Sequence, residues 1–464
     1  MKRSNSFIID LLGIGISLVV FLLFLLVWYT PLLANQLSSF DFPGKSTGDL
    51  AFDVDVYQFQ GENKKTNLEV AYSIDLSQFS IPKIQTDTIR FLIKLEVDGS
   101  RLENLIKIEK EKRIPFNRET SNEKGYFYFN LERFSIEPDA VRLHFEISDL
   151  SGSKRGLVNY NFNIKKFSNG LSVSDIVFIK PPIQRSEAKS PFIRRGIMMI
   201  PNPSRLYNIT DSNQFILFYF EINNLSFAKD YPSTYSLFYK IYDLMGNEVL
   251  SKKYESLPVN ASNIPRLERI DLEDISPGVY KFIVYVTDLR IAETVKIQKY
   301  FRIHSNTKSA ELILPMTEKD IKKYYNQIKY LASEAELNVF NSLDPKGKQA
   351  FLLKFWKSRD PNPDTPENEF MVEYFSKMDY CEEHFKGGID SDMGRIYMKY
   401  GPPLDIKRIV STTQFTKPVE IWTYAQGGHF EFVFVDRTGD NKYILVHSTH
   451  PDEYHNPDWE MELK

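Results

Sequence analysis

The sequence predicts a multidomain protein with two β-sandwich (immunoglobulin-like) modules followed by an α+β C-terminal domain, with helices first and a small antiparallel sheet after. Three observations predict this organisation. A chain of 464 residues provides for about three domains of ~150 residues each. Apolar residues recur with a period of two across the first two thirds, and the period changes to 3.6 after residue 313. An aromatic content of 14% suits the half-buried faces of β-sheets.

The first segment, residues 1–34, predicts export. Lys2 and Arg3 precede an apolar run of 19 residues, 11–29. Such a run can cross a hydrocarbon core of ~30 Å at 1.5 Å per residue, and it is longer than the ~7–15 apolar residues of a cleaved signal. We expect either a signal peptide, with Ala34 as the small residue at the cleavage site, or an N-terminal membrane anchor with N-in/C-out topology. Both place the rest of the chain outside the cytosol.

Two blocks of strand-like pattern follow, residues 50–168 and 172–305. In the first block, the apolar residues of 141–147 alternate with polar ones, which is typical of strands with one buried face. The second block contains a near-continuous apolar run, 214–222, and a turn at Met245-Gly246-Asn247-Glu248, where Gly and Asn tolerate positive φ. Several strands at short spacing favour one sandwich for each block. One larger β unit is the alternative, because only a short polar break separates the blocks.

The last block, residues 315–464, begins with helical periodicity. Thr317 and Asp320 form an acidic version of a capping box before an apolar stripe that runs to Ala335. Asp344-Pro345 predicts the start of a second helix, and Thr365-Pro366 the start of a third. Strand patterns then return, which predicts an α+β domain. The expected strands are 395–400, 420–424, 430–435 and 443–447.

An unusual set of motifs lies between residues 355 and 403. It comprises Phe355-Trp356-Lys357-Ser358-Arg359-Asp360-Pro361, Gly388-Ile389-Asp390-Ser391-Asp392, Gly394-Arg395-Ile396-Tyr397 and Tyr400-Gly401-Pro402-Pro403. Their order and spacing resemble the bacterial GWxTD-domain family, whose motif appears here with Ile389 in place of Trp and Ser391 in place of Thr. The resemblance covers about a third of the chain. It implies a domain and a cell-envelope setting rather than a reaction.

Polar residues of these motifs form the candidate functional patch. The structural interpretation is that they serve helix ends, since cations are favoured in a last helical turn and acids in a first turn. The functional interpretation is that paired Arg and carboxylate groups orient a partner or ligand with directional hydrogen bonds. The patch consists of Arg359, Asp360, Glu367, Asn368, Glu369, Gly388, Asp390, Asp392 and Arg395.

The sequence predicts no catalytic set, no metal site and no cofactor. Four of the seven histidines lie near the C-terminus, at positions 429, 447, 450 and 455, but they lack the spacing of a zinc site and we expect surface and turn roles. The single cysteine, Cys381, lies in an apolar stripe and is expected to be a small buried hydrophobic residue. A net charge of −3 without a basic block argues against nucleic-acid binding.

We therefore expect an exported, extracytoplasmic protein of the bacterial cell envelope (periplasmic, or membrane-anchored through residues 1–34) that acts as a non-catalytic interaction or scaffold module. Its expected partners are other envelope proteins. The alternative is an enzyme or small-ligand-binding protein with a site in the GWxTD-like domain, at the candidate patch. Glycan binding by aromatic residues on the sandwiches is a third alternative.

Overall fold

The computed structural model describes residues 44–80, 88–99, 105–115, 126–138, 140–209, 215–272, 275–305, 314, 316–363, 368–409, 417–425 and 428–463. The apolar N-terminal run that predicts export lies outside these residues. Among the described ranges, no helix combines the length and the apolar character that crossing a membrane requires.

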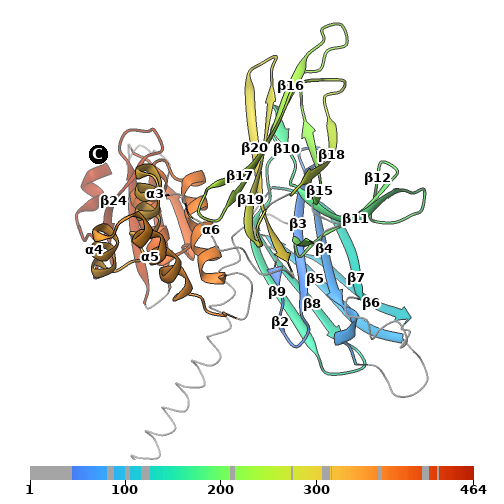
Figure 1. Ribbon diagram of the computed structural model, residues 1–464, viewed down its shortest axis with the longest axis horizontal. Helices are drawn as coiled ribbons and strands as arrows, with labels where there is room; N and C mark the ends of the chain where they lie inside the picture. Colours follow the sequence, from blue (N-terminus) through green and yellow to red (C-terminus); the bar gives the residue numbers. More distant parts are fainter. Residues whose placement is uncertain are drawn as a thin grey trace, which may run out of the picture.

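The first sandwich consists of two antiparallel sheets (Figure 1), and aromatic side chains fill the core between them. Phe52 and Tyr72 from one sheet meet Phe145 from the other, with ring centroids 5.6 and 4.8 Å apart. One sheet has the order β1 (Gly44–Lys45), β3 (Phe52–Gln60), β4 (Thr66–Asp75) and β7 (Phe127–Ile136), and the other has β2 (Thr47–Gly48), β9 (Arg155–Asn163), β8 (Ala140–Asp149), β5 (Thr88–Gly99) and β6 (Ile106–Pro115).

The second sandwich also consists of two packed sheets, which are antiparallel except for the parallel pairing of β14 with β20. Phe218 from one sheet packs edge-on against Phe282 from the other at 4.8 Å. One sheet has the order β10 (Ser172–Val173), β15 (Phe215–Asn223), β11 (Val177–Arg185), β13 (Ile197–Pro201) and β12 (Ile193–Arg194), with β18 (Ile264–Asp271) also paired to β15, and the other has β14 (Leu206–Ile209), β20 (Glu293–Ser305), β19 (Gly278–Asp288), β16 (Thr234–Asp243) and β17 (Glu248–Pro258).

The two sandwiches pack against each other and share a buried apolar cluster. Tyr57 and Phe59 of β3 lie in this cluster together with Val177 and Ile179 of β11. A charged group lies in the same interface: the Asp55 carboxylate of β3 binds Arg205 and Lys299 of the second sandwich, and all three side chains are almost fully buried. The predicted pair of sandwiches is therefore present, and the two sandwiches share a buried interface.

The C-terminal domain is α+β, as predicted, with helices first and a four-stranded antiparallel sheet after. The capping box at Thr317 and Asp320 and the N-cap at Asp344 are both confirmed. Cys381 is fully buried, also as predicted. The elements are α3 (Glu318–Ile328), α4 (Glu334–Ser342), α5 (Pro345–Lys357), α6 (Glu369–His384), η3 (Gly388–Asp390), α7 (Asp392–Tyr400), β21 (Asp405–Ile409), β22 (Val419–Tyr424), β23 (Phe430–Asp436), β24 (Tyr443–Ser448) and η4 (Trp459–Leu463).

Three details of the helical region differ from the prediction. The strand expected at 395–400 is wrong: this segment belongs to α7, because Ser391 caps the helix by accepting the Gly394 N–H at 3.0 Å. The first apolar stripe is split, since α3 ends at Ile328 and Ser333 starts a separate helix with its own capping box. Helix α6 begins at Glu369 with Asn368 as N-cap, whereas the start predicted at 365–366 lies outside the described residues.

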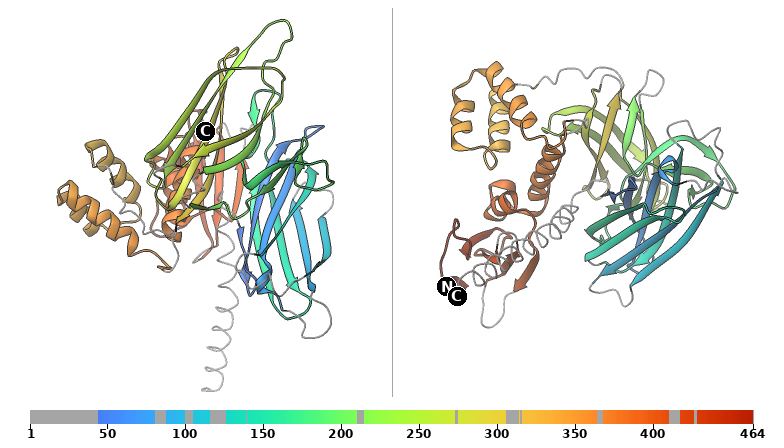
Figure 2. Two further views of the ribbon diagram at one scale, coloured as in Figure 1. Left: turned by 45° about the vertical axis from the view of Figure 1, so that its right-hand side comes forward. Right: turned by 90° about the horizontal axis from the view of Figure 1, so that it is seen from below.

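The turn between β16 and β17 reaches into the C-terminal domain (Figure 2). Met245 at this turn is buried in the same apolar cluster as Tyr324 and Ile328 of α3. The backbone carbonyl of Met245 accepts a hydrogen bond from Gln327 at 3.0 Å, and Asn247 accepts one from Lys323 at 2.7 Å. The turn predicted from sequence therefore forms the core contact between the second sandwich and the helices. We call residues 244–247 the hairpin plug.

Candidate functional site

The candidate patch is divided between separate local contacts. At the end of α5, the Arg359 guanidinium binds Glu336 of α4 at 2.8 Å and lies 3.6 Å from the centroid of the Phe355 ring. The hydrogen bond from Arg359 lowers the pKa of Glu336. Asp360 instead accepts the backbone N–H of Asn362 at 3.0 Å. Arg359 and Asp360 thus have different partners.

The next patch residues join the ends of helices. Asn368 caps α6 through Met371, and its amide donates to the carbonyl of Trp356 at 2.6 Å. Glu369 lies in the first turn of α6, where an acid was expected. Glu367 lies outside the described residues.

The GWxTD-like loop connects α3 to the C-terminal sheet. Asp390 forms an ion pair with Lys329 just after α3, and Tyr330 donates to the carbonyl of Ile389 at 2.9 Å. Asp392 accepts the backbone N–H of Leu445 in β24 at 2.9 Å. Gly388 has a φ of +55°, which a residue with a side chain rarely adopts. These motif residues therefore link three elements of the domain: the end of α3, the GWxTD-like loop and β24.

Arg395 has a partner that the sequence did not indicate. Its guanidinium binds Glu453 at 2.7 Å, and the same carboxylate accepts from Lys399 at 2.8 Å and from Tyr400 at 2.9 Å. Burial opposes ionisation of Glu453, but these hydrogen bonds outweigh it and lower its pKa. Sequence patterns did not indicate Glu453 as this partner, because Glu453 follows the last strand in a segment without a periodic pattern.

The C-terminal histidines lie in two different contacts. The His447 and His455 rings are 4.9 Å apart, and His447 Nδ1 accepts the Asn456 N–H at 3.1 Å. Burial, together with His455, lowers the pKa of His447. His450 instead packs against the Tyr400 ring at 4.8 Å. Turn and packing roles therefore account for these imidazoles.

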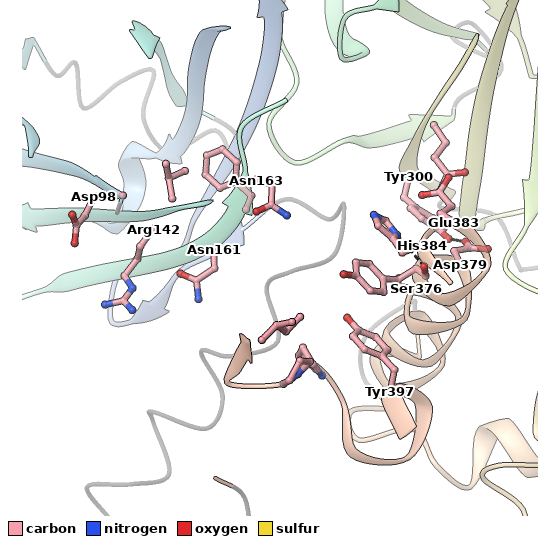
Figure 3. Close-up of a pocket in the computed structure, with 18 residues that line it drawn as sticks. Asp98, Arg142, Asn161, Asn163, Tyr300, Ser376, Asp379, Glu383, His384 and Tyr397 are labelled. Atoms are coloured by element: carbon pink, nitrogen blue, oxygen red, sulfur yellow. Dashed lines mark hydrogen bonds between the residues drawn. The ribbon is translucent and has the colours of Figure 1, made fainter. Parts of the chain in front are cut away.

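A cleft with both polar and apolar lining lies where the two sandwiches and the C-terminal domain meet, and we call it the three-module cleft. Its volume is about 760 Å³. Figure 3 shows its two walls: Arg142, Asn161 and Asn163 on the first sandwich face Asp379 and His384 of the C-terminal domain across open space. The remaining labelled residues that line it are Asp98, Tyr300, Ser376, Glu383 and Tyr397.

Helix α6 forms one wall of this cleft, and two ion pairs bind it to the second sandwich. Asp379 binds Lys281 of β19 at 2.7 Å and also accepts from the Tyr300 hydroxyl of β20. One turn further, Glu383 binds Lys296 at 3.1 Å. Burial raises the pKa of Asp379, and Lys281 offsets part of this rise. The wall is thus held in position by β19 and β20, and β20 also lines the cleft with Gln298 and Tyr300.

Aromatic rings continue this wall. Tyr380 stacks on His384 at 4.1 Å and on Tyr397 at 4.6 Å. The His384 Nδ1 atom lies 3.0 Å from the carbonyl oxygen of Tyr380. Because a carbonyl only accepts hydrogen bonds, Nδ1 carries a hydrogen, which makes Nε2 the acceptor atom of the neutral ring.

The other wall and the floor carry amide side chains. Asn161 and Asn163 come from β9, and Gln298 comes from β20. Each amide side chain has both a donor and an acceptor. The cleft can therefore accept hydrogen bonds from the N–H groups of a peptide backbone and donate hydrogen bonds to its carbonyl groups, or to other polar groups. A second cavity of about 640 Å³ adjoins the first and shares Asn163, Gln298 and His384 with it. Sequence reasoning missed this site because its residues come from three modules and form no local motif.

Solved structures that resemble the chain include bacterial glycosidases, of which the chain covers about a third. Parabacteroides merdae β-glucuronidase has 11% identity and a TM-score of 0.17, with 56% of this chain and 35% of that chain covered. A putative β-galactosidase from Bacteroides fragilis has 9% identity and a TM-score of 0.17, with 50% and 32% covered. No curated protein matches the sequence.

The family comparison concerns the last third of the chain. Residues 304–461 match the family model of the GWxTD domain. This range agrees with the resemblance carried by the motifs between residues 355 and 403, and it contains all five α-helices that the structure describes. The C-terminal third of this chain is therefore a GWxTD domain.

Proposed function

We propose that this protein is an exported cell-envelope protein that acts as a non-catalytic scaffold and binds a segment of a partner protein in the three-module cleft. One observation carries the proposal: three modules are joined by buried or half-buried ion pairs and jointly line one cleft that contains several amide and charged side chains. A site of this kind depends on the assembled chain rather than on any single domain.

Three ties support the rigidity of the arrangement. Asp55 and Arg205 join the sandwiches, Met245 enters the GWxTD domain, and Asp379 holds α6 against Lys281. A site on a fixed framework binds with a smaller ordering cost than one formed by loose domains. The walls of the cleft are thus preorganised.

The chemistry of the cleft favours an extended peptide segment. The amides of Asn161, Asn163 and Gln298 can hydrogen-bond to both N–H and C=O groups of a backbone. Arg142 on one wall and Glu383 on the other offer charges of opposite sign to the side chains of the segment. The alternative, a ligand site at the candidate patch, has less support because the described patch residues serve caps and ion pairs at separate places.

Site-specific photo-crosslinking tests the interaction. A benzophenone amino acid replaces Asn161 or His384 in the full-length chain in its native cells, and Leu353, an exposed residue of α5, provides the control. We expect the same partner to be captured from both cleft positions and not from position 353. Arg142→Glu should weaken both cross-links. The absence of a reproducible partner at both cleft positions would contradict the proposal.

A pair of reporters tests the compartment separately. Alkaline phosphatase fused after Lys464 should be active, because it folds only outside the cytosol, whereas a green fluorescent protein fused there should stay dark. The opposite pattern would contradict export, which depends on the apolar run in residues 1–34.

A further inference from the structure

Four apolar side chains are exposed together at one end of the second sandwich. Phe227 and Tyr231 lie in the loop between β15 and β16, and Leu289 and Ile291 lie in the turn between β19 and β20. Their exposed fractions are 43, 69, 46 and 52%. We call these four residues the apolar tip. Figure 1 shows both loops at the end of the sandwich that points away from the GWxTD domain.

The two loops of the apolar tip are bound to each other. The Leu289 N–H donates to the carbonyl of Thr234 at 3.1 Å. The fully buried Asp288 accepts the Ser226 N–H at 2.7 Å and the Arg290 N–H at 3.0 Å. These bonds hold the two loops side by side, so that the four exposed side chains lie at the same end of the sandwich.

The backbone of the apolar tip is also suited to an environment without water. The Phe227 N–H donates to the Leu225 carbonyl at 2.7 Å, and the Tyr231 N–H donates to the Ala228 carbonyl at 3.2 Å. Polar backbone groups entering lipid must be satisfied within the protein, and these N–H groups are. Phe and Tyr side chains are common at membrane interfaces, where aliphatic neighbours penetrate further.

Charged residues surround the apolar tip. Lys229 and Arg290 can bind lipid phosphates, while Asp230 and Glu293 balance their charge. Attraction to anionic lipid is therefore a small part of the expected binding, and apolar insertion is the main part.

We propose that the apolar tip inserts into the surface of a lipid membrane and thereby provides a membrane contact separate from residues 1–34. This contact lies on a different surface from the three-module cleft and goes beyond the proposed scaffold function. Exposed aromatic and aliphatic side chains on loops whose N–H groups at Phe227, Tyr231 and Leu289 are bonded within the protein suit a fluid lipid surface, which needs no cavity of matching shape.

The single buried cysteine allows a direct test. Cys381 is fully buried, so Ile291→Cys introduces one exposed thiol for a polarity-sensitive dye. The full-length protein is held in nanodiscs and mixed with vesicles of phosphatidylethanolamine and phosphatidylglycerol. We expect the emission of the dye to shift to shorter wavelength and to be quenched by brominated lipid. This response should occur either in the nanodisc or after vesicles are added. A dye at Val339→Cys, which is equally exposed on α4, should not respond.

A matched pair of variants gives the second measurement. The double variant Phe227→Ser/Leu289→Ser should reduce vesicle capture of the nanodisc-held protein by roughly tenfold or more. Val339→Ser/Leu353→Ser removes two exposed apolar residues elsewhere and should leave capture unchanged. An unresponsive dye at position 291 together with equal capture of both variants would overturn the proposal. The proposal would also be overturned if the dye at position 291 responded to another added protein but not to lipid.

Discussion

Asp55 and Arg205 form a two-point ion pair inside the interface of the two sandwiches, with Oδ2 2.8 Å from Nε and Oδ1 2.6 Å from Nη2. Each side chain is only 1% exposed, and the Lys299 ammonium lies 3.4 Å from the same carboxylate. Two cations and one anion are thus enclosed between the sandwiches, although Asp55 and Arg205 are 150 positions apart in sequence. The carboxylate is the only member that can offset both cations.

Asp55→Asn should therefore destabilise the joined sandwiches by about 3–5 kcal/mol, because it leaves two buried cations without their counter-charge. The denaturant midpoint of the full-length protein measures this change. Asp49→Asn, on an exposed position just before β3, is the control and should change the unfolding free energy by less than about 0.5 kcal/mol. Equal midpoints for the two variants would show that the pair contributes little.

Met245→Ala should loosen the GWxTD domain from the second sandwich at a cost of about 2–5 kcal/mol, because it empties a buried position among helix residues. Hydrogen exchange of α3 amides should become faster while the core of the first sandwich stays protected. Val249→Ala, on an exposed position of the same hairpin, provides the control. Unchanged protection of α3 would mean that the hairpin plug does not hold the domain.

Sequence patterns predicted those parts of the fold whose causes are local. Thr317 and Asp320 lie three residues apart and bond to each other, so the capping box was readable directly. Period-two alternation likewise predicted both sandwiches, because each strand contributes one face to a core. The turn at Gly246 and Asn247 was also predicted, although nothing local indicated that it would enter another domain.

The errors arose where tertiary packing decides the structure. The segment 395–400 has a strand-like composition, but Ile396 and Tyr397 are buried against other elements of the GWxTD domain and the segment is helical. The three-module cleft was missed for a related reason. Asn161 and His384 are 223 positions apart, and only the docking of modules brings them to one cavity.

Gly394→Ala should destabilise the GWxTD domain, although replacing Gly by Ala inside a helix normally stabilises by up to ~1 kcal/mol. A Cβ atom at position 394 would lie 2.1 Å from the Gly388 carbonyl oxygen and 2.8 Å from the Ile389 Cα. Backbone atoms cannot move aside as a side chain does, so the motif loop must shift. Thermal unfolding measures the sign, and a raised melting temperature would refute the tight contact.

The Glu453 cluster should make the GWxTD domain acid-sensitive. Hydrogen bonds from Lys399 and Arg395 lower the pKa of Glu453 from its ordinary value of 4.5 despite burial. Its stabilising contribution is complete above pH 4.5 and is lost as the pH falls through the lower folded-state value. Denaturant midpoints measured between pH 3 and 6 should fall less steeply for Glu453→Gln than for the wild type. Glu460→Gln, an exposed acid nearby, should follow the wild type.

The hairpin plug also changes what counts as one domain. The matched family range starts at residue 304, whereas Met245 lies 59 positions earlier and is part of the same apolar cluster as α3. A recombinant fragment cut at the family boundary would lack this piece and carry an unfilled hollow beside Tyr324. The last third should therefore be expressed together with residues 234–258 as a separate strand pair. Without them, the isolated fragment should be less stable.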